Sequence, residues 1–163
     1  MQDEKVRSLE VLESEQVKSI EKIVEKNYGA AFDLKQFLVM KTSEEKIWIA
    51  SKDIAKVDFS KISVNSIGLY FGKLKRNNKI NLSTEGCQMI GKNAKKNVAV
   101  VDKDSAERFL RGNDVIPIEA AECENQNFVI LKCGEDFLGS SLFVDGKISN
   151  ILPKSRRLLD KSL

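Results

Sequence analysis

Lysine and arginine are concentrated in two segments of this sequence, where they are suited to binding a polyanion. Between Gly68 and Lys96 there are seven basic residues and one acidic residue. From Lys147 to the end there are five basic residues and one acidic residue, whereas residues 97–146 carry four basic and ten acidic residues. Two basic segments that met in space would form a phosphate-binding surface. Each segment could equally be a solvated face, and charge alone leaves both interpretations open.

The first basic segment combines cations with aromatic rings. Its sequence from 68 to 76, GLYFGKLKR, has the alternation of an exposed strand. Only one of Tyr70 and Phe71 can face outward from such a strand, where it could stack on a base. The other ring belongs in the core, and burial is the more common fate of either. The cations that would contact phosphates are Lys73, Lys75 and Arg76.

The second basic segment follows the last predicted strand. Pro153 turns the chain out of that strand, because proline lacks the N–H that a sheet requires. Adjacent arginines offer planar guanidinium groups that suit phosphates and bases. The cations of this segment are Lys154, Arg156, Arg157 and Lys161.

The residues that most enzymes use are missing or wrongly spaced. The sequence has no histidine, which excludes Ser-His-Asp and Cys-His catalysis and His-ligated metals. The three cysteines form no CxxC pair and predict neither a zinc site nor a disulfide framework. Residues 86–93, GCQMIGKN, nearly match a phosphate-binding loop, but Asn93 replaces the magnesium-binding Ser or Thr, so we interpret them as helical. We expect no catalysis, metal, cofactor or small-molecule substrate.

Residues 104–116, DSAERFLRGNDVI, predict a short helix with a defined start and end. Asp104 can accept hydrogen bonds from the first-turn N–H groups, with Glu107 three residues later. Gly112 can adopt the left-handed conformation that ends a helix. Strands are predicted before it, at 98–101, and after it, at 115–120.

The N-terminal half predicts one helix and two hairpins. Apolar residues at three- and four-residue spacing indicate a helix from Ser14 to Tyr28, ended by Gly29. Runs at 36–40 and 46–50 predict one hairpin, in which we interpret Trp48 as a core residue. Runs at 64–74 and 79–82 predict a second hairpin with a turn at 76–79.

These elements predict an α+β protein of two packed domains. An N-terminal mixed α/β domain occupies residues 1–94, and residues 95–163, with strands at 128–132, 138–144 and 147–151 punctuated by glycines, predict a small β pseudo-barrel. The absence of a linker indicates that the domains pack together. No apolar run of membrane-spanning length or secretory signal is present, so we expect a cytoplasmic protein without membrane contact.

The segment from Ser66 to Ile116 resembles a known family. Residues 104–116 are similar to the opening of a PUA domain, a small RNA-binding pseudo-barrel, and the two-domain order resembles the Nip family of ribosome-assembly factors and their archaeal relatives. Residues 71–73, FGK, and 110–113, LRGN, carry most of this resemblance. Pro117-Ile118 and Ser141 depart from the usual glycine pattern. The resemblance implies RNA contacts at Arg111, at Gly112 and along the tail from Lys154 to Arg157.

We therefore expect a non-catalytic RNA-binding protein, acting in ribosome assembly or processing of ribosomal RNA precursors, with assembly proteins as further partners. One alternative is an accessory subunit that binds tRNA for an RNA-modifying enzyme. Another is a protein–protein adaptor. The sequence does not choose the RNA, the partner or the oligomeric state.

Overall fold

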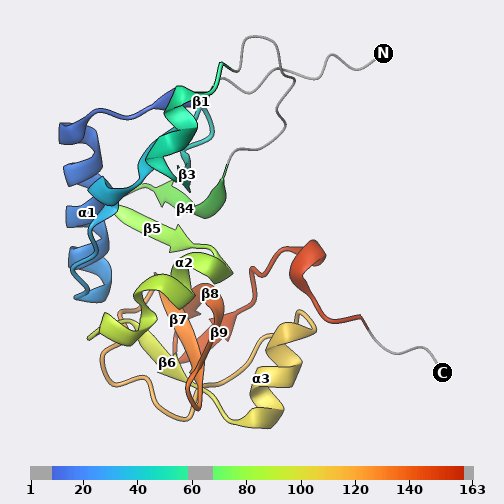
Figure 1. Cartoon of the computed structure of the whole chain (residues 1–163). Helices are drawn as coiled ribbons and strands as arrows, with labels where there is room; N and C mark the ends of the chain where they lie inside the picture. The colour runs from blue at the N-terminus through green and yellow to red at the C-terminus, as the bar shows by residue number, and fades with distance from the viewer. Residues whose placement is uncertain (1–8, 59–67, 160–163) are drawn as a thin grey trace.

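The computed structural model describes residues 9–58 and 68–159, which form two sheets with helices between and around them (Figure 1). The first sheet is antiparallel, and its strands are β1 (Leu9–Val11), β2 (Leu38–Thr42), β3 (Lys46–Ala50), β4 (Leu69–Lys75) and β5 (Lys79–Leu82), in that order. The second contains β6 (Val98–Val100), β7 (Asn127–Cys133), β8 (Asp136–Val144) and β9 (Lys147–Ser149). In it, β6 runs parallel to β7 and the remaining pairs are antiparallel. The predicted α+β class is confirmed.

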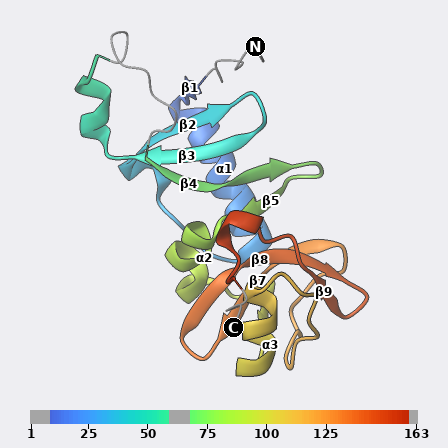
Figure 2. The ribbon, with the colours of Figure 1, turned by 90° about the vertical axis from the view of Figure 1, so that its right-hand side faces the viewer.

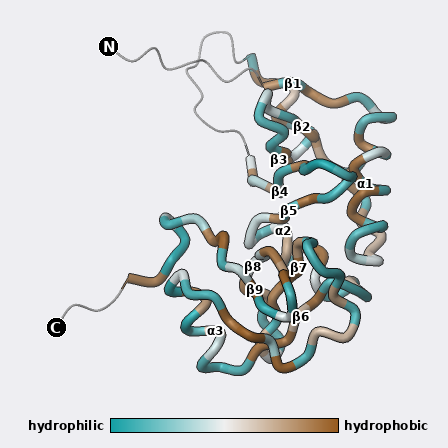
Figure 3. Tube along the Cα trace, turned by 180° about the vertical axis from the view of Figure 1, so that it is seen from behind, coloured by the Kyte–Doolittle hydropathy of each residue, from teal (hydrophilic) through white to brown (hydrophobic). Residues whose placement is uncertain are grey.

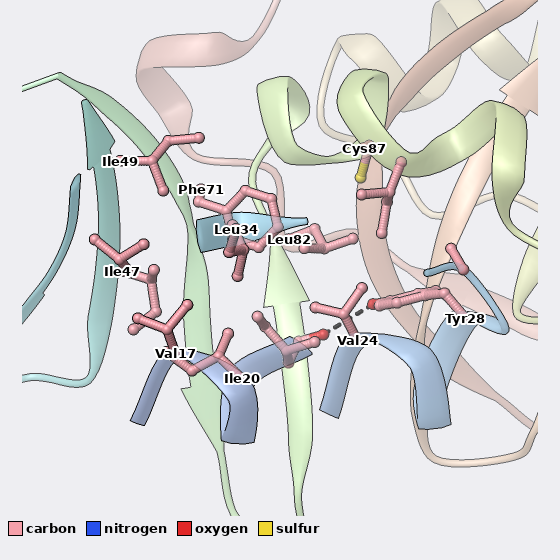
Figure 4. Packing of buried hydrophobic residues seen from close by; sticks show 14 of the residues in the cluster. Val17, Ile20, Val24, Tyr28, Leu34, Ile47, Ile49, Phe71, Leu82 and Cys87 are labelled. Carbon is pink, nitrogen blue, oxygen red and sulfur yellow. Dashed lines mark hydrogen bonds between the residues drawn. The ribbon is translucent and has the colours of Figure 1, made fainter. Parts of the chain in front are cut away.

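Helix α1 (Ser14–Tyr28) covers one face of the first sheet. The apolar residues between the helix and this face form a hydrophobic core. Hydrophobic and hydrophilic residues alternate along the helix (Figure 3), so one side packs on the sheet. Val17, Ile20 and Val24 pack against β3 and β5, as Figure 4 shows. The Tyr28 hydroxyl donates to the carbonyl oxygen of Ile80 at 2.8 Å. The helix ends at Gly29, with φ of +63°, as predicted.

The two predicted hairpins are present with small shifts. Strand β2 begins two residues later than predicted, and β3 matches its prediction. The turn between β4 and β5 places Asn77 and Asn78 at φ of +61° and +53°, a conformation that asparagine tolerates. The predicted strand at 64–74 is described only from residue 68 onward, and residues 64–67 lie outside the described residues.

Helix α2 (Thr84–Ile90) lies between the two sheets, and Gly86 in its first turn and Gly91 at its C-terminal end both allow close packing. A Cβ at Gly86 would lie 2.3 Å from the carbonyl oxygen of Phe71 in β4. A Cβ at Gly91 would lie 2.5 Å from the Phe137 ring in β8. The resemblance of 86–93 to a phosphate-binding loop therefore comes from helix packing, and the helical interpretation is confirmed.

Helix α3 (Lys103–Leu110) begins earlier than the sequence predicted. Asp102, not Asp104, caps it by accepting from the Ser105 N–H at 2.8 Å. Asp104 is already inside the first turn and exposed, so the predicted cap was wrong. Gly112 has φ of +98° after the helix, as expected for a left-handed terminus.

The predicted strand at 115–120 is also wrong. Only isolated bridges form there, between Val115 and Ile148 and between Glu119 and Val100. Pro117 has no N–H to donate, and the side chains of Ile116 and Ile118 are 68% and 61% exposed. This segment closes the second sheet without adding a strand.

None of the described helices combines the length and the apolar composition that crossing a lipid bilayer requires.

Candidate functional site

The Arg111–Gly112 turn and the C-terminal segment contact each other directly. The Arg157 side chain crosses Gly112, because a Cβ at Gly112 would lie 2.8 Å from the Cδ of Arg157. The Leu158 N–H donates to the Leu110 carbonyl oxygen at 2.8 Å and holds the segment along the end of α3. The predicted site residues Arg111, Gly112 and Arg157 thus lie together, Lys154 and Arg156 belong to the 3-10 turn that directly precedes Arg157, and Lys161 lies outside the described residues.

The two adjacent arginines are not equivalent. Arg156 is exposed and forms an ion pair with Glu85 of α2. Arg157 is half-buried and donates from Nε to the Leu152 carbonyl oxygen at 2.9 Å. The expectation that both are exposed was therefore wrong for Arg157, which also holds the tail in place.

Charge compensation differs among the remaining cations of this neighbourhood. Arg111 pairs with Glu107 at 2.9 Å along α3. Lys154 is exposed, and no carboxylate among the residues that the structure describes forms an ion pair with it or with Arg157. These two cations are the ones best able to attract an external anion.

The basic hairpin β4–β5 reaches the second sheet. The ammonium of Lys75 lies 6.0 Å from the centre of the Phe128 ring. The Lys79 ammonium donates to the Gln126 carbonyl oxygen at 2.7 Å. Burial, and then the neighbouring charge of Lys73, lower the pKa of Lys75. The hairpin therefore carries cations, and two of them, Lys75 and Lys79, also contact the second half of the chain.

The face of the first sheet that points away from α1 carries an aromatic pair. The rings of Trp48 and Tyr70 lie 5.3 Å apart and are tilted by 43°. The register shifts where β3 meets β4, so that Ile47 opposes Gly72 while Trp48 opposes Tyr70. Trp48 lies between the buried Ile47 and Ile49, so the alternation of the strand turns it outward; it is half-exposed and was wrongly interpreted as a core residue. Phe71, by contrast, is buried, which confirms that only one of the two adjacent rings faces outward.

Lysines flank this aromatic pair on the same sheet face. Lys73 lies opposite Lys46 in β3 and opposite Asn81 in β5. Residues directly opposite in antiparallel strands share a face, so Lys73 lies on the side of Trp48 and Tyr70. Figure 2 shows this face of β2 to β4 in front of α1, with the 3-10 turn Lys154–Arg156 below it on the same side. We call this side, defined by Trp48, Tyr70, Lys73, Lys154, Arg156 and Arg157, the basic–aromatic side.

Three buried asparagines join the two halves of the chain. Asn97 lies just before β6 with φ of +55°, and its amide donates to the Asn27 carbonyl oxygen at 2.6 Å. Asn127 donates to the Asn27 side-chain oxygen at 3.3 Å. The sequence analysis missed this cluster. Its only local signal was a polar residue in the last turn of α1, since the partners lie 70 and 100 positions away.

The cysteines and acidic residues of the described part of the chain do not cluster as the ligands of a metal ion do. No group of three or more Cys, Asp and Glu is placed to hold a metal ion among these residues. Burial raises the pKa of the Cys123 thiol to about 11, with a smaller effect of Glu122, and raises that of Cys87 further. Both thiols are therefore protonated at neutral pH and poor nucleophiles.

Comparison with known proteins identifies the C-terminal part. Residues 96–158 match the family model of the PUA domain of methyltransferase RsmF. Residues 96–158 are thus similar to a PUA domain, and we name them the PUA domain after this similarity. A conserved PUA domain protein from Thermoplasma acidophilum has a similar structure, with a TM-score of 0.61 and 11% identity over 91% of this chain and 97% of that chain.

A PUA domain of Aeropyrum pernix K1, solved as a tartrate complex, is also similar, with a TM-score of 0.54 and 15% identity over 85% of this chain and 74% of that chain. Curated protein sequences give no match. The likeness to the Thermoplasma protein covers 91% of this chain, so it extends over both sheets. The more specific resemblance to the Nip family stays a prediction.

Proposed function

We propose that this chain is a non-catalytic RNA-binding protein. The observation that carries the proposal is that the basic–aromatic side extends over both sheets, from β4, which carries Lys73, to the 3-10 turn Lys154–Arg156 (Figure 2). Phosphate contacts by such cations supply most of the affinity of proteins for RNA backbones. The half-exposed pair of Trp48 and Tyr70 adds rings that suit bases.

The RNA we propose is a precursor of ribosomal RNA, bound in the cytoplasm during ribosome assembly. The two-domain order and the residues of the Leu110–Asn113 turn support this choice, because they resemble the Nip family of assembly factors. Assembly proteins would then be further partners.

A second candidate function is that of an accessory subunit that binds tRNA for an RNA-modifying enzyme. The specific support is the match of residues 96–158 to the PUA domain of a methyltransferase. The described residues include no cluster that suggests chemistry of their own, so a separate subunit would have to supply it.

Crosslinking of the full chain to RNA in cells, followed by sequencing of the bound RNA, tests both functions. Ribosomal reads support the assembly role, and tRNA reads support the accessory role. Absence of crosslinked RNA above the level of a sample that was not crosslinked would contradict RNA binding itself, and equal crosslinking of a Lys154→Ala, Arg157→Ala variant would place the site elsewhere.

A further inference from the structure

A cavity of about 90 Å³ lies between the two domains, on the basic–aromatic side. Tyr70 forms one wall, and the cavity continues between β5, the start of α2 and β8. The segment from Ile151 to Pro153 and the side chain of Arg156 close it from the PUA domain. Its place between the domains is typical of ligand sites.

Glu85 contributes an unsatisfied acceptor to the lining of this cavity. Its Oε1 pairs with Arg156, but its Oε2 is buried and has no hydrogen-bond donor among the described residues. Leaving a buried carboxylate oxygen without a donor is unfavourable. The last torsion angle of a glutamate side chain has a broad distribution. A small rotation about it therefore turns this oxygen toward the cavity when a donor enters.

The lining restricts what can occupy the cavity. Glu85 disfavours a phosphate or another anion, and Arg156 disfavours a cation. The neighbouring polar groups are the hydroxyls of Thr84 and Ser140 and the amide of Asn81, which accepts from Ser140 at 2.5 Å. A neutral ring with both donors and acceptors satisfies all of them. The volume is far below the roughly 300–1,000 Å³ of sites for larger ligands, which limits the occupant to a single small ring and excludes a base pair.

We propose that this cavity takes one unpaired RNA base, with its Watson–Crick edge donating to Glu85 and its ring lying against Tyr70. This inference rests on the proposed function and deepens it, because it makes the chain selective for RNA with an unpaired nucleotide. In a perfect duplex the donors of that edge are occupied by the opposite base, so the cavity stays without a ligand. Backbone contacts of the basic–aromatic side are the same for both kinds of RNA.

The test compares the affinities of the full chain for a perfect RNA duplex and for the same duplex with one bulged nucleotide, at one salt concentration. We expect the wild-type chain to bind the bulged duplex about tenfold more tightly, as one hydrogen bond to a charged acceptor would give. In Glu85→Gln the difference between the two duplexes should fall to about twofold or less, because an amide replaces the charged acceptor. Glu135→Gln, in the exposed β7–β8 turn, makes the same charge change and should keep the preference.

The wild-type comparison stands even if Glu85→Gln does not fold, which urea unfolding followed by the fluorescence of the single Trp48 would reveal. Equal wild-type affinity for both duplexes overturns the base-binding cavity while leaving RNA binding intact. Unchanged preference in a folded Glu85→Gln variant also overturns it. Failure of both duplexes to bind at low salt overturns the proposed function.

Discussion

The side-chain amide of Asn97 donates to the backbone carbonyl oxygen of Asn27 at 2.6 Å and ties the first strand of the PUA domain to the end of α1. The Oδ1 of Asn97 accepts from the Glu124 N–H at 2.8 Å, and Asn27 donates to the Asn78 carbonyl oxygen at 2.8 Å. One buried cluster thus joins α1, the basic hairpin and the PUA domain. A buried polar network whose hydrogen bonds are all satisfied favours one arrangement of the groups it joins, so the two sheets should move as one body.

Asn97→Ala should destabilise the whole chain by about 3 kcal/mol, because it leaves buried groups unpaired and places alanine at a positive φ. Urea unfolding at neutral pH measures this. Asn97→Gly is the matched control, since it removes the same hydrogen bonds but tolerates the backbone angle, and it should be less destabilising by about 1 kcal/mol. A loss below about 1 kcal/mol for both variants would contradict the network's role.

Gly112→Ala should reduce stability more than Gly134→Ala does, by about 1 kcal/mol or more. Both glycines have positive φ, +98° and +58°, but only at Gly112 would a Cβ meet another side chain, that of Arg157. Thermal unfolding of the two variants compares them directly. Equal losses of stability in the two variants would mean that the contact of Arg157 with Gly112 does not hold the C-terminal segment in place.

Local signals were enough to predict the elements that depend only on neighbours in sequence. The limits of α1 and the turn at Asn77 and Asn78 follow from apolar spacing, Gly29 and asparagine's tolerance of positive φ. The start of α3 illustrates the limit of such signals, because Asp102 and Asp104 both satisfy the capping rule. Which of the two aspartates caps α3 depends on where β6 ends, and the pairing of β6 with β7 decides where β6 ends.

The candidate site was only partly accessible from the sequence. The basic residues and the Gly112 turn could be named, but the pairing of Trp48 with Tyr70 depends on a register shift that involves another strand. The burial of Arg157 depends on contacts with a glycine 45 positions earlier. Charge and periodicity carry no information on such long-range contacts.

Asp102→Ala should lower the unfolding midpoint at neutral pH, whereas Asp104→Ala should leave it nearly unchanged. The backbone N–H of Ser105 holds the pKa of Asp102 below its ordinary value. A lowered pKa stabilises the fold above the unfolded-state value of about 3.9, and this contribution is lost as the pH falls through the folded-state pKa. The difference between wild type and Asp102→Ala should therefore shrink in acid. A larger loss for Asp104→Ala than for Asp102→Ala would return the cap to Asp104.

RNA affinity should fall steeply with salt, because phosphate contacts release counterions. Titrations at several salt concentrations give the slope of log affinity against log salt. Lys154→Ala should reduce the magnitude of this slope by about 1 and leave stability unchanged, since Lys154 is exposed. Lys22→Ala, exposed on α1 across the sheet, is the control and should keep the wild-type slope. A flat salt response would rule out an electrostatic interface.

Lys73→Glu with Arg76→Glu should weaken binding of a long RNA about tenfold or more, and should affect a short oligonucleotide that occupies only the PUA domain much less. The reason is the fixed position of the hairpin beside the PUA domain, which Lys75 and Lys79 maintain through Phe128 and Gln126. Folding should be preserved, because Lys73 lies opposite Lys46 and its reversal replaces a like-charge pair by an opposite pair.

The matched control for the hairpin variant is Lys22→Glu with Lys26→Glu, which makes the same charge change on α1, behind the sheet. It should bind both RNAs nearly as wild type does, because these lysines face away from the basic–aromatic side. Equal losses in the control would show a general effect of net charge. If the hairpin variant weakens long and short RNA alike, or neither, the RNA surface does not extend onto the N-terminal domain, and the hairpin cations are then free to contact a protein partner.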